Sequence, residues 1–176
     1  QRAIQLVKEN HLQYNIDTTK IGVMGFSAGG HLAGTAATYY QRNYMETLGI
    51  TPSVSLRPDF AVMIYPVVSM MDSIAHRKSR ANLLGRCCSA EDKATMSLDL
   101  NVHNGMPPVF LMHCRYDKTV DYRNAFYYQK ALKEKDVPCK FLLYDERGHG
   151  FGINPNSRKR KAPAWINELI PWLKDI

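Results

Sequence analysis

The sequence predicts an α/β fold with a mostly parallel sheet flanked by helices. Segments with the composition of helices alternate with four short apolar segments, which is the order typical of a parallel sheet. The first apolar segment shows little polar alternation, as expected of a strand that is covered on both faces. The four expected strands are residues 21–26, 60–65, 109–113 and 140–144.

Length and composition indicate one globular unit that spans residues 1–176. The chain is 45% hydrophobic and 22% charged, which is ordinary for a folded domain. No apolar run approaches the ~20 residues needed to span a bilayer, so we expect no membrane partner. The chain begins without Met inside an amphipathic segment. We therefore expect it to be part of a longer protein, with any targeting sequence upstream.

The basic residues are unevenly distributed. The net charge is +7, and about half of the excess lies in residues 158–161 (RKRK). Such a run can bind nucleic acid or another polyanion, or it can be a solvated loop before the last helix. No aromatic residues interleave with it and no nucleic-acid-binding motif accompanies it. These features favour a solvated loop, and we expect no nucleic-acid partner.

The four cysteines, Cys87, Cys88, Cys114 and Cys139, have no zinc-type spacing. Adjacent cysteines form a poor disulfide. Cys114 would end the third strand where Cys139 begins the fourth, too far apart to bridge. We expect free thiols.

The helices follow from periodicity and capping signals. We expect helices over residues 1–14, from the end of the turn at residues 25–30 to about residue 40, and over 122–135. Residues 69–104 form a longer excursion of mixed composition, similar to a cap, with short helices near 80–84 and 90–96. Ser89 with Asp92 predicts the cap of the second short helix. A final helix starts at Pro163, and Pro171 should kink or interrupt it.

The strongest motif is residues 25–30 (GFSAGG), which places a serine on a sharp turn between a strand and a helix. Side chains two residues before and after Ser27 would collide there. Gly25 and Gly29 are therefore expected to let the serine hydroxyl project from the end of the sheet. The helix N-terminus offers free N–H groups to a developing oxyanion.

Two further polar residues are expected at the same edge of the sheet, where sites form in open α/β sheets. Asp117 follows the third strand and His149, between two glycines, follows the fourth. Serine catalysis requires a hydroxyl, a base and a carboxylate that orients the base. Along the chain these residues occur in the order Ser, Asp, His, which is typical of α/β-hydrolases. Asp121 is the rival acid, although it is better placed to cap the next helix.

The other five histidines are weaker candidates. His31 lies in the helix after Ser27, His113 lies within a strand, and His11, His76 and His103 have no partner pattern. No H-E-x-x-H motif or carboxylate–histidine cluster suggests a metal, and we expect no cofactor.

The sequence resembles the α/β-hydrolase superfamily, in particular the bacterial acetyl-xylan and feruloyl esterase-like proteins found beside xylanases. The similarity extends over nearly the whole chain, and the SRANLLG match at residues 79–85 is the most specific to this group. The segments that carry it are residues 15–17 (NID), 20–33 (KIGVMGFSAGGHLA), 57–60 (RPDF), 65–67 (YPV), 76–85 (HRKSRANLLG), 117–120 (DKTV) and 148–152 (GHGFG).

The resemblance implies a serine esterase in which Ser27 is the nucleophile, Asp117 the acid and His149 the base. It implies that the N–H of Ala28 is one oxyanion donor. The implied reaction removes acetyl or feruloyl groups from xylan or its oligosaccharides through an acyl-enzyme, without a metal. The parent protein would be a secreted or periplasmic bacterial enzyme. The acyl group, the sugar and the oligomeric state stay open.

The sequence departs from the family pattern in two ways. Asp121 stands where the family usually has proline. No His-Gly-Gly-Gly oxyanion loop occurs in these 176 residues, so we expect the first strands of the full fold and the second oxyanion donor to be absent from this chain. Two alternatives remain open. One is a serine peptidase of the prolyl-oligopeptidase kind, although those generally carry Tyr at the position of Ala28. The other is a non-catalytic fragment.

Overall fold

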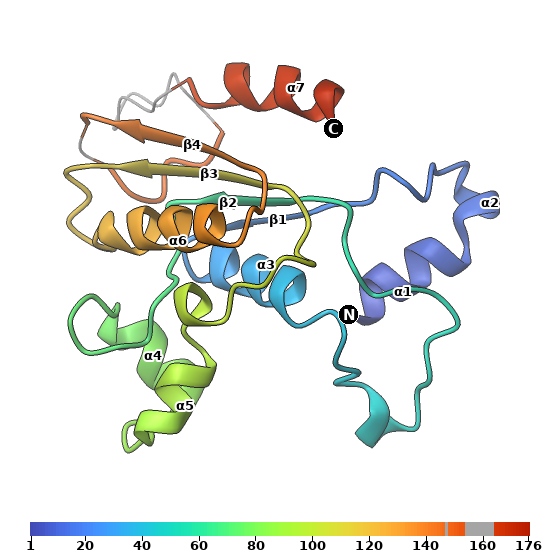
Figure 1. The fold of residues 1–176 in the computed structure, drawn as a ribbon, viewed down its shortest axis with the longest axis horizontal. Coiled ribbons are helices and arrows are strands. Elements are labelled where there is room, and N and C mark those ends of the chain that lie inside the picture. Colours follow the sequence, from blue (N-terminus) through green and yellow to red (C-terminus); the bar gives the residue numbers. More distant parts are fainter. Residues whose placement is uncertain (147, 154–163) are drawn as a thin grey trace.

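The computed structural model describes residues 1–146, 148–153 and 164–176 (Figure 1). Its centre is a four-stranded sheet in the order β1-β2-β3-β4, and every neighbouring pair is parallel. The predicted α/β fold with a parallel sheet is confirmed. The strands are Val23–Phe26 (β1), Ala61–Ile64 (β2), Val109–Cys114 (β3) and Cys139–Tyr144 (β4).

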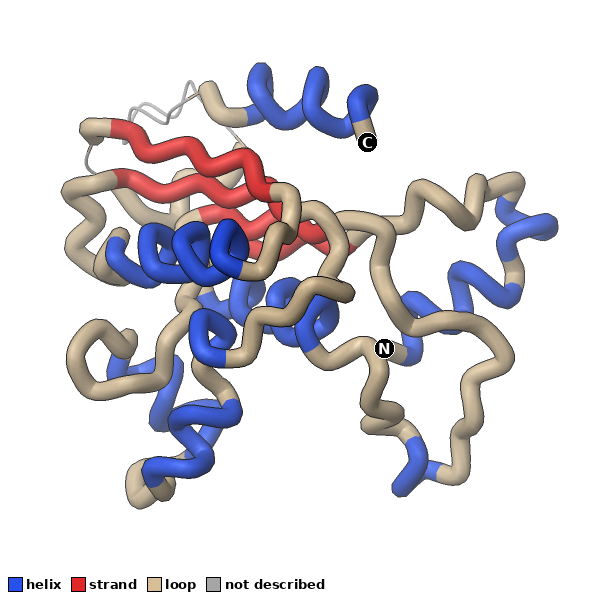
Figure 2. The backbone as a smooth tube through the Cα atoms, viewed as in Figure 1, coloured by secondary structure: helices blue, strands red, loops and turns tan. Residues whose placement is uncertain are grey.

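The strand register aligns the carboxyl ends of the strands. Phe26 pairs with Ile64, and Ile64 pairs with Met112. Cys114, at the end of β3, pairs with Tyr144 at the end of β4. The loops that follow the four strands therefore begin at one edge of the sheet (Figure 2), where the sequence places its candidate site.

Helices cover the two faces of the sheet. Helices α3 (Ala28–Thr38) and α6 (Arg123–Glu134) lie on one face, and α7 (Ile166–Asp175) lies on the other (Figure 1). The alternation of side chains along the strands divides the core accordingly. Met63 and Leu111 pack with Tyr128 of α6 in one cluster. Val62 and Phe110 pack in the other with a larger set, which includes Trp165 and Leu169.

Strand β1 is less buried than its sequence predicts. It is an edge strand of the sheet, and the Met24 side chain in its centre is 45% exposed. Leu32, on the outer face of α3, is 71% exposed. The expectation that β1 is covered on both faces is therefore wrong for the described residues. The inner strands β2 and β3 are covered on both faces, because every residue in them is buried.

The N-terminal helix is shorter than expected. It divides into α1 (Arg2–Glu9) and α2 (His11–Tyr14), and Asn15 ends α2 in a left-handed conformation with φ of 52°. Lys8 is buried, although the helical pattern places it on the polar face. Its Nζ donates to the carbonyl oxygen of Arg57 at 2.7 Å, which ties α1 to the segment before β2.

The excursion after β2 contains α4 (Arg77–Leu84), α5 (Ala90–Thr95) and the 3-10 helix η2 (Leu98–Leu100). Helices α4 and α5 lie beyond the α3 and α6 layer, away from the sheet (Figure 1). The predicted capping box at the start of α5 is confirmed, since Ser89 and Asp92 each accept the other's backbone N–H. A further 3-10 helix, η1 (Glu46–Leu48), lies in the loop between α3 and β2.

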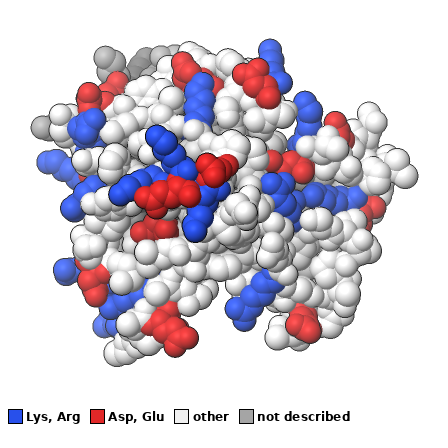
Figure 3. Space-filling view, viewed as in Figure 1, with Lys and Arg blue, Asp and Glu red and all other residues white. Residues whose placement is uncertain are grey.

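Helix α7 continues through Pro171, so the expected interruption does not occur there. Pro163 and the basic run at residues 158–161 lie outside the described residues. On the face shown in Figure 3, acidic and basic side chains are interspersed.

The four cysteines are free, as predicted, and burial raises the pKa of the Cys114 and Cys139 thiols to about 12. Thiols this weakly acidic are poor nucleophiles at neutral pH.

Candidate active site

Ser27 occupies a strained turn between β1 and α3. Its backbone has φ of 54° and ψ of −119°, a region that non-glycine residues rarely occupy. Such a residue costs ~1–3 kcal/mol unless its surroundings hold it in place. Here the Ser27 N–H donates to the Ile64 carbonyl at 3.0 Å, and the Ser27 carbonyl accepts the N–H of Val67 at 3.1 Å. The backbone of β2 and the segment after it therefore fix the turn.

The glycines around Ser27 differ in whether a side chain would fit at their positions. A Cβ at Gly25 would clash with the carbonyl oxygen of Gly29, and one at Gly30 would lie 2.7 Å from Cβ of Pro66. A Cβ at Gly29 would meet nothing within 4 Å. The sequence interpretation was right for Gly25 and wrong for Gly29. The second close approach is at Gly30, where α3 packs against the end of β2.

The structure brings Ser27, His149 and Asp117 together. Nε2 of His149 lies 2.8 Å from Oγ of Ser27, and Nδ1 of the same ring lies 2.7 Å from Oδ2 of Asp117. Both are hydrogen-bond distances. The Asp117 side chain is fully buried, whereas the His149 side chain keeps some solvent exposure. A buried carboxylate, a ring and a hydroxyl thus form one chain of hydrogen bonds.

The Asp117 carboxylate is held on both oxygens. Oδ1 accepts the backbone N–H groups of Thr119 at 2.8 Å and Val120 at 3.1 Å. Burial raises the pKa of Asp117, but hydrogen bonds from His113, His149 and these two amides outweigh it and bring the pKa well below its usual range. Asp117 is therefore ionised at neutral pH.

The ionised carboxylate fixes the protonation of His149. It can only accept, so the neutral ring carries its proton on Nδ1 and presents the Nε2 lone pair to Ser27. The Ser27 hydroxyl then donates to Nε2. This arrangement can remove the hydroxyl proton as Oγ forms a bond, and it can stabilise the resulting imidazolium.

Tyr65 also supports His149, a role that the sequence does not indicate. Its ring centroid lies 4.6 Å from that of His149, and its hydroxyl accepts the N–H of Gly152 at 3.1 Å. Tyr65 has a φ of 39°, which is unusual for an aromatic residue. Tyr65 therefore packs against the His149 ring and hydrogen-bonds to the loop that carries it.

Ala28 is the first residue of α3, so its N–H is one of the groups that an α-helix leaves without an internal acceptor. Ala28 is the residue immediately after Ser27 in the chain.

Asp121 is directed elsewhere. Its carboxylate forms an ion pair with Arg123 at 2.6 Å and accepts the Arg123 backbone N–H at 2.9 Å, close to the capping role expected for it.

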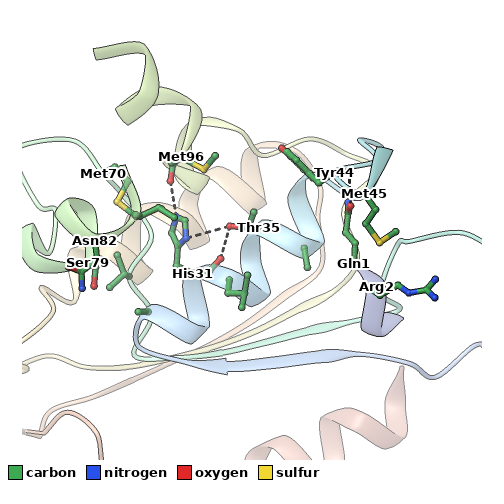
Figure 4. A pocket seen from close by; sticks show the side chains of 15 residues that line it. Gln1, Arg2, His31, Thr35, Tyr44, Met45, Met70, Ser79, Asn82 and Met96 are labelled. Carbon is green, nitrogen blue, oxygen red and sulfur yellow. Dashed lines mark hydrogen bonds between the residues drawn. The ribbon is translucent and has the colours of Figure 1, made fainter. Parts of the chain in front are cut away.

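Two histidines have roles that the sequence did not indicate. His31 is buried, and its Nε2 lies 2.8 Å from the carbonyl oxygen of Met96, which links α3 to the segment after α5 (Figure 4). His113, dismissed as a strand residue, has its Nε2 3.3 Å from Oδ2 of Asp117. Strand periodicity gives the face on which a residue lies, but it does not show which loop residue folds back against it.

A cavity of about 630 Å³ lies along α3 (Figure 4), and Ala28 is among its lining residues. Val67 and Met70 contribute apolar side chains. Ser79 and Asn82 of α4 contribute polar groups. A second, polar hollow of about 400 Å³ has Asp117, Lys118 and His76 among its lining residues. Both hollows include residues from the 69–104 excursion.

Within residues 1–146, 148–153 and 164–176, no group of three His, Cys, Asp or Glu side chains is arranged to hold a metal ion. In the same part of the chain, none of the helices has the length and apolar character needed to cross a membrane.

Known proteins with related sequences and structures include esterases and xylan-degrading enzymes. The chain is 34% identical to an acetyl ester-xyloside bifunctional hydrolase from Caldicellulosiruptor lactoaceticus, with a TM-score of 0.86 over 99% of this chain and 63% of that one. A putative carboxylesterase from Lactobacillus plantarum matches with a TM-score of 0.74 at 24% identity, over 99% of this chain and 66% of that one. These neighbours establish the α/β-hydrolase fold.

Among curated proteins, an acetylxylan esterase from Xylanibacter ruminicola is 27% identical over the whole of this chain, which spans 35% of that protein. Endo-1,4-beta-xylanase B from Butyrivibrio fibrisolvens is 30% identical over 86% of this chain and 24% of that protein. The chain thus spans about a quarter to a third of these relatives. The family model BD-FAE matches residues 1–132, three quarters of the sequence. The chain belongs to the BD-FAE family.

Proposed function

We propose that this chain carries the catalytic site of a serine carboxylic ester hydrolase, in which Ser27 is the nucleophile, His149 the general base and Asp117 the acid that orients it. The observation that carries the proposal is the continuous relay from Oδ2 of Asp117 through both nitrogens of His149 to Oγ of Ser27. Membership of the BD-FAE family supports the same class of reaction.

In the acylation step, Oγ of Ser27 bonds to the ester carbonyl carbon while its proton passes to Nε2 of His149. The carbonyl oxygen becomes an oxyanion, and the Ala28 N–H at the start of α3 donates to it. Asp117, ionised and buried, stabilises the imidazolium. The ester C–O bond then breaks, and His149 returns the proton to the leaving alcohol oxygen.

In the deacylation step, water gives a proton to Nε2 of His149 as its oxygen bonds to the acyl carbon. The bond between the acyl carbon and Oγ of Ser27 breaks, and His149 protonates that oxygen. The carboxylic acid leaves and the original protonation state is restored. One ester and one water are consumed for each acid and alcohol formed.

We propose acetylated or feruloylated xylan, or its oligosaccharides, as the substrate class. The support is similarity to an acetylxylan esterase and to an acetyl ester-xyloside hydrolase. We further propose that residues 1–176 form a single, partial α/β-hydrolase domain and that residues 69–104 act as its cap. Ser79, Asn82 and Met96, all from this segment, line the same cavity as Ala28.

The test compares acetate release by the wild type with release by Ser27→Ala and by Ser53→Ala, a control at an exposed serine. The substrates are an aryl acetate and acetylated xylo-oligosaccharide. Ser27→Ala should lose about 10⁶ in kcat, as expected when a triad acts as a unit, and Ser53→Ala should match the wild type. Undiminished turnover in Ser27→Ala would refute the proposal.

The same assay distinguishes a peptidase. The chain is 25% identical to an acylamino-acid-releasing enzyme from Rattus norvegicus over 96% of its length, which is 22% of that protein. Cleavage of an acyl-peptide, with no turnover of either acetyl ester, would favour that alternative over an esterase.

A further inference from the structure

His113 is a fully buried histidine in β3 that the proposed mechanism does not use. Its Nε2 lies 3.0 Å from the carbonyl oxygen of Val120 and 3.3 Å from Oδ2 of Asp117. One ring nitrogen therefore faces two acceptors in the loop that follows β3. Oδ2 of Asp117 is also the oxygen that binds Nδ1 of His149.

The partners of His113 determine its tautomer. A carbonyl oxygen can only accept, so Nε2 of His113 carries a proton and donates it. Nδ1 is buried and has no hydrogen-bond partner among the described residues. A proton on Nδ1 would place an N–H donor in the interior without an acceptor, which is unfavourable. In the neutral ring of His113, the proton is therefore on Nε2.

His113, Val120 and Asp117 contact one another in the loop that follows β3. The Val120 N–H donates to Oδ1 of Asp117, and the Val120 carbonyl accepts from His113. The same His113 N–H faces Oδ2 of Asp117. The carboxylate is thus restrained on one oxygen by the loop backbone and on the other by the β3 ring. Rotation of the carboxylate away from His149 would break contacts at both of its oxygens.

We propose that His113 is a positioning residue that holds the Asp117 carboxylate in the orientation in which Oδ2 meets His149. Its effect on turnover rests on the proposed function, but its effect on the Asp117–His149 hydrogen bond does not. His113 acts through Asp117 and does not touch the reacting atoms.

Two substitutions separate positioning from simple packing. His113→Gln places an amide N–H near the position of Nε2 and can donate to the same acceptors. His113→Leu fills similar space without a donor. If His113 only fills the core, the two variants should behave alike at the site. If it positions Asp117, Gln should preserve the site and Leu should not.

The first measurement uses NMR without substrate, so its outcome is independent of any esterase activity. The readout is the low-field proton resonance of His149 Nδ1–H, assigned by its loss in His149→Gln. We expect it in the wild type and in His113→Gln, and we expect it to be broadened or shifted upfield in His113→Leu. An unchanged resonance in a folded His113→Leu would overturn the proposal.

A measurement on the wild type keeps the proposal testable if His113→Leu does not fold. Long-range proton–nitrogen correlation spectra report which ring nitrogen of His113 is protonated. We expect the proton on Nε2, the nitrogen that faces the Val120 carbonyl and Oδ2 of Asp117. A ring protonated on Nδ1 and not on Nε2 could not donate to either acceptor and would overturn the proposal.

Kinetics supply the remaining readout. His113→Leu should lose on the order of 10- to 100-fold in kcat, because a misplaced group costs rate even when it is remote from the chemistry. KM should stay nearly constant, and His113→Gln should restore most of kcat. Wild-type kcat in a folded His113→Leu would overturn the proposal. Absence of turnover in the wild type with the NMR difference intact would instead count against the proposed function.

Discussion

Oδ2 of Asp117 lies 2.7 Å from Nδ1 of His149, although 32 residues separate them in the chain. The contact depends on the parallel pairing of β3 with β4, which aligns the ends of the two strands. The loops that follow these strands then carry the carboxylate and the ring to the same edge of the sheet. Asp117 lies beside His149, whereas the Asp121 carboxylate pairs with Arg123.

Replacement of Asp117 by Asn should abolish most turnover while leaving the fold intact. An amide can donate to Nδ1 of His149, which would shift the ring proton to Nε2 and remove the lone pair that faces Ser27. We expect a loss of about 10⁴ in kcat for an aryl acetate. Asp121→Asn is the matched control and should keep kcat within a few-fold of the wild type. An equal loss in both variants would contradict the assignment of the acid.

The glycines at the turn should respond oppositely to alanine. Gly25→Ala introduces a Cβ that clashes with the carbonyl oxygen of Gly29, so we expect a loss of at least about 1–3 kcal/mol in the free energy of unfolding. Gly29→Ala meets nothing within 4 Å and lies in α3, so we expect a gain of up to about 1 kcal/mol. Urea unfolding of both variants measures the difference. Equal stabilities would mean that the turn relaxes around Gly25.

His31 should make the protein sensitive to acid. Burial lowers its pKa below the ordinary value, although its hydrogen bond to the Met96 carbonyl opposes the shift. The unfolded chain therefore takes up a proton at a higher pH than the folded protein does. The stability that His31 contributes is present above the unfolded pKa of about 6.5 and is lost as the pH falls through the lower folded pKa.

The test of this pH dependence is His31→Gln, which can still donate to the Met96 carbonyl but does not titrate. Between pH 7 and pH 5, the free energy of unfolding should fall more steeply in the wild type than in His31→Gln. Parallel curves for the two proteins, measured by urea unfolding at several pH values, would show that His31 is not the group responsible.

Asn124 should be one of the most sensitive positions for stability. It is fully buried, and its Oδ1 accepts the N–H groups of Val68 and Ser69, both at 2.9 Å. Its Nδ2 donates to the carbonyl oxygens of Ile74 and Asp121, both at 3.0 Å. Asn124→Leu would remove three buried hydrogen bonds and one partly buried hydrogen bond to the backbone, so we expect a loss of at least about 2 kcal/mol. A change below 0.5 kcal/mol, on the order of a surface substitution, would contradict this account.

The sequence predicts the fold and the three main site residues because their signals are local. The G-x-S-x-G spacing requires a tight turn at Ser27. Asp117 and His149 lie three and five residues after the ends of apolar strands. The capping box at Ser89 is equally local, since its partner Asp92 lies three residues away.

The features that the sequence misses depend on contacts between distant segments. His113 meets Asp117 only because the loop folds back along β3, and Lys8 is buried because its amine reaches the carbonyl of Arg57. Met24 is exposed because β1 lies at the edge of the sheet, and strand composition alone does not report strand order. The close approach at Gly30 likewise involves Pro66, 36 positions further along the chain.

The central claim is that His149 and Asp117 activate Ser27 as a nucleophile. Incubation with a fluorophosphonate followed by intact-mass and peptide mass spectrometry tests it most directly, because only an activated serine reacts rapidly with this reagent. We expect a single adduct on Ser27 in the wild type, none in Ser27→Ala, and greatly slowed labelling in His149→Gln. An adduct on another residue, or equal labelling of Ser27→Ala and the wild type, would contradict the account.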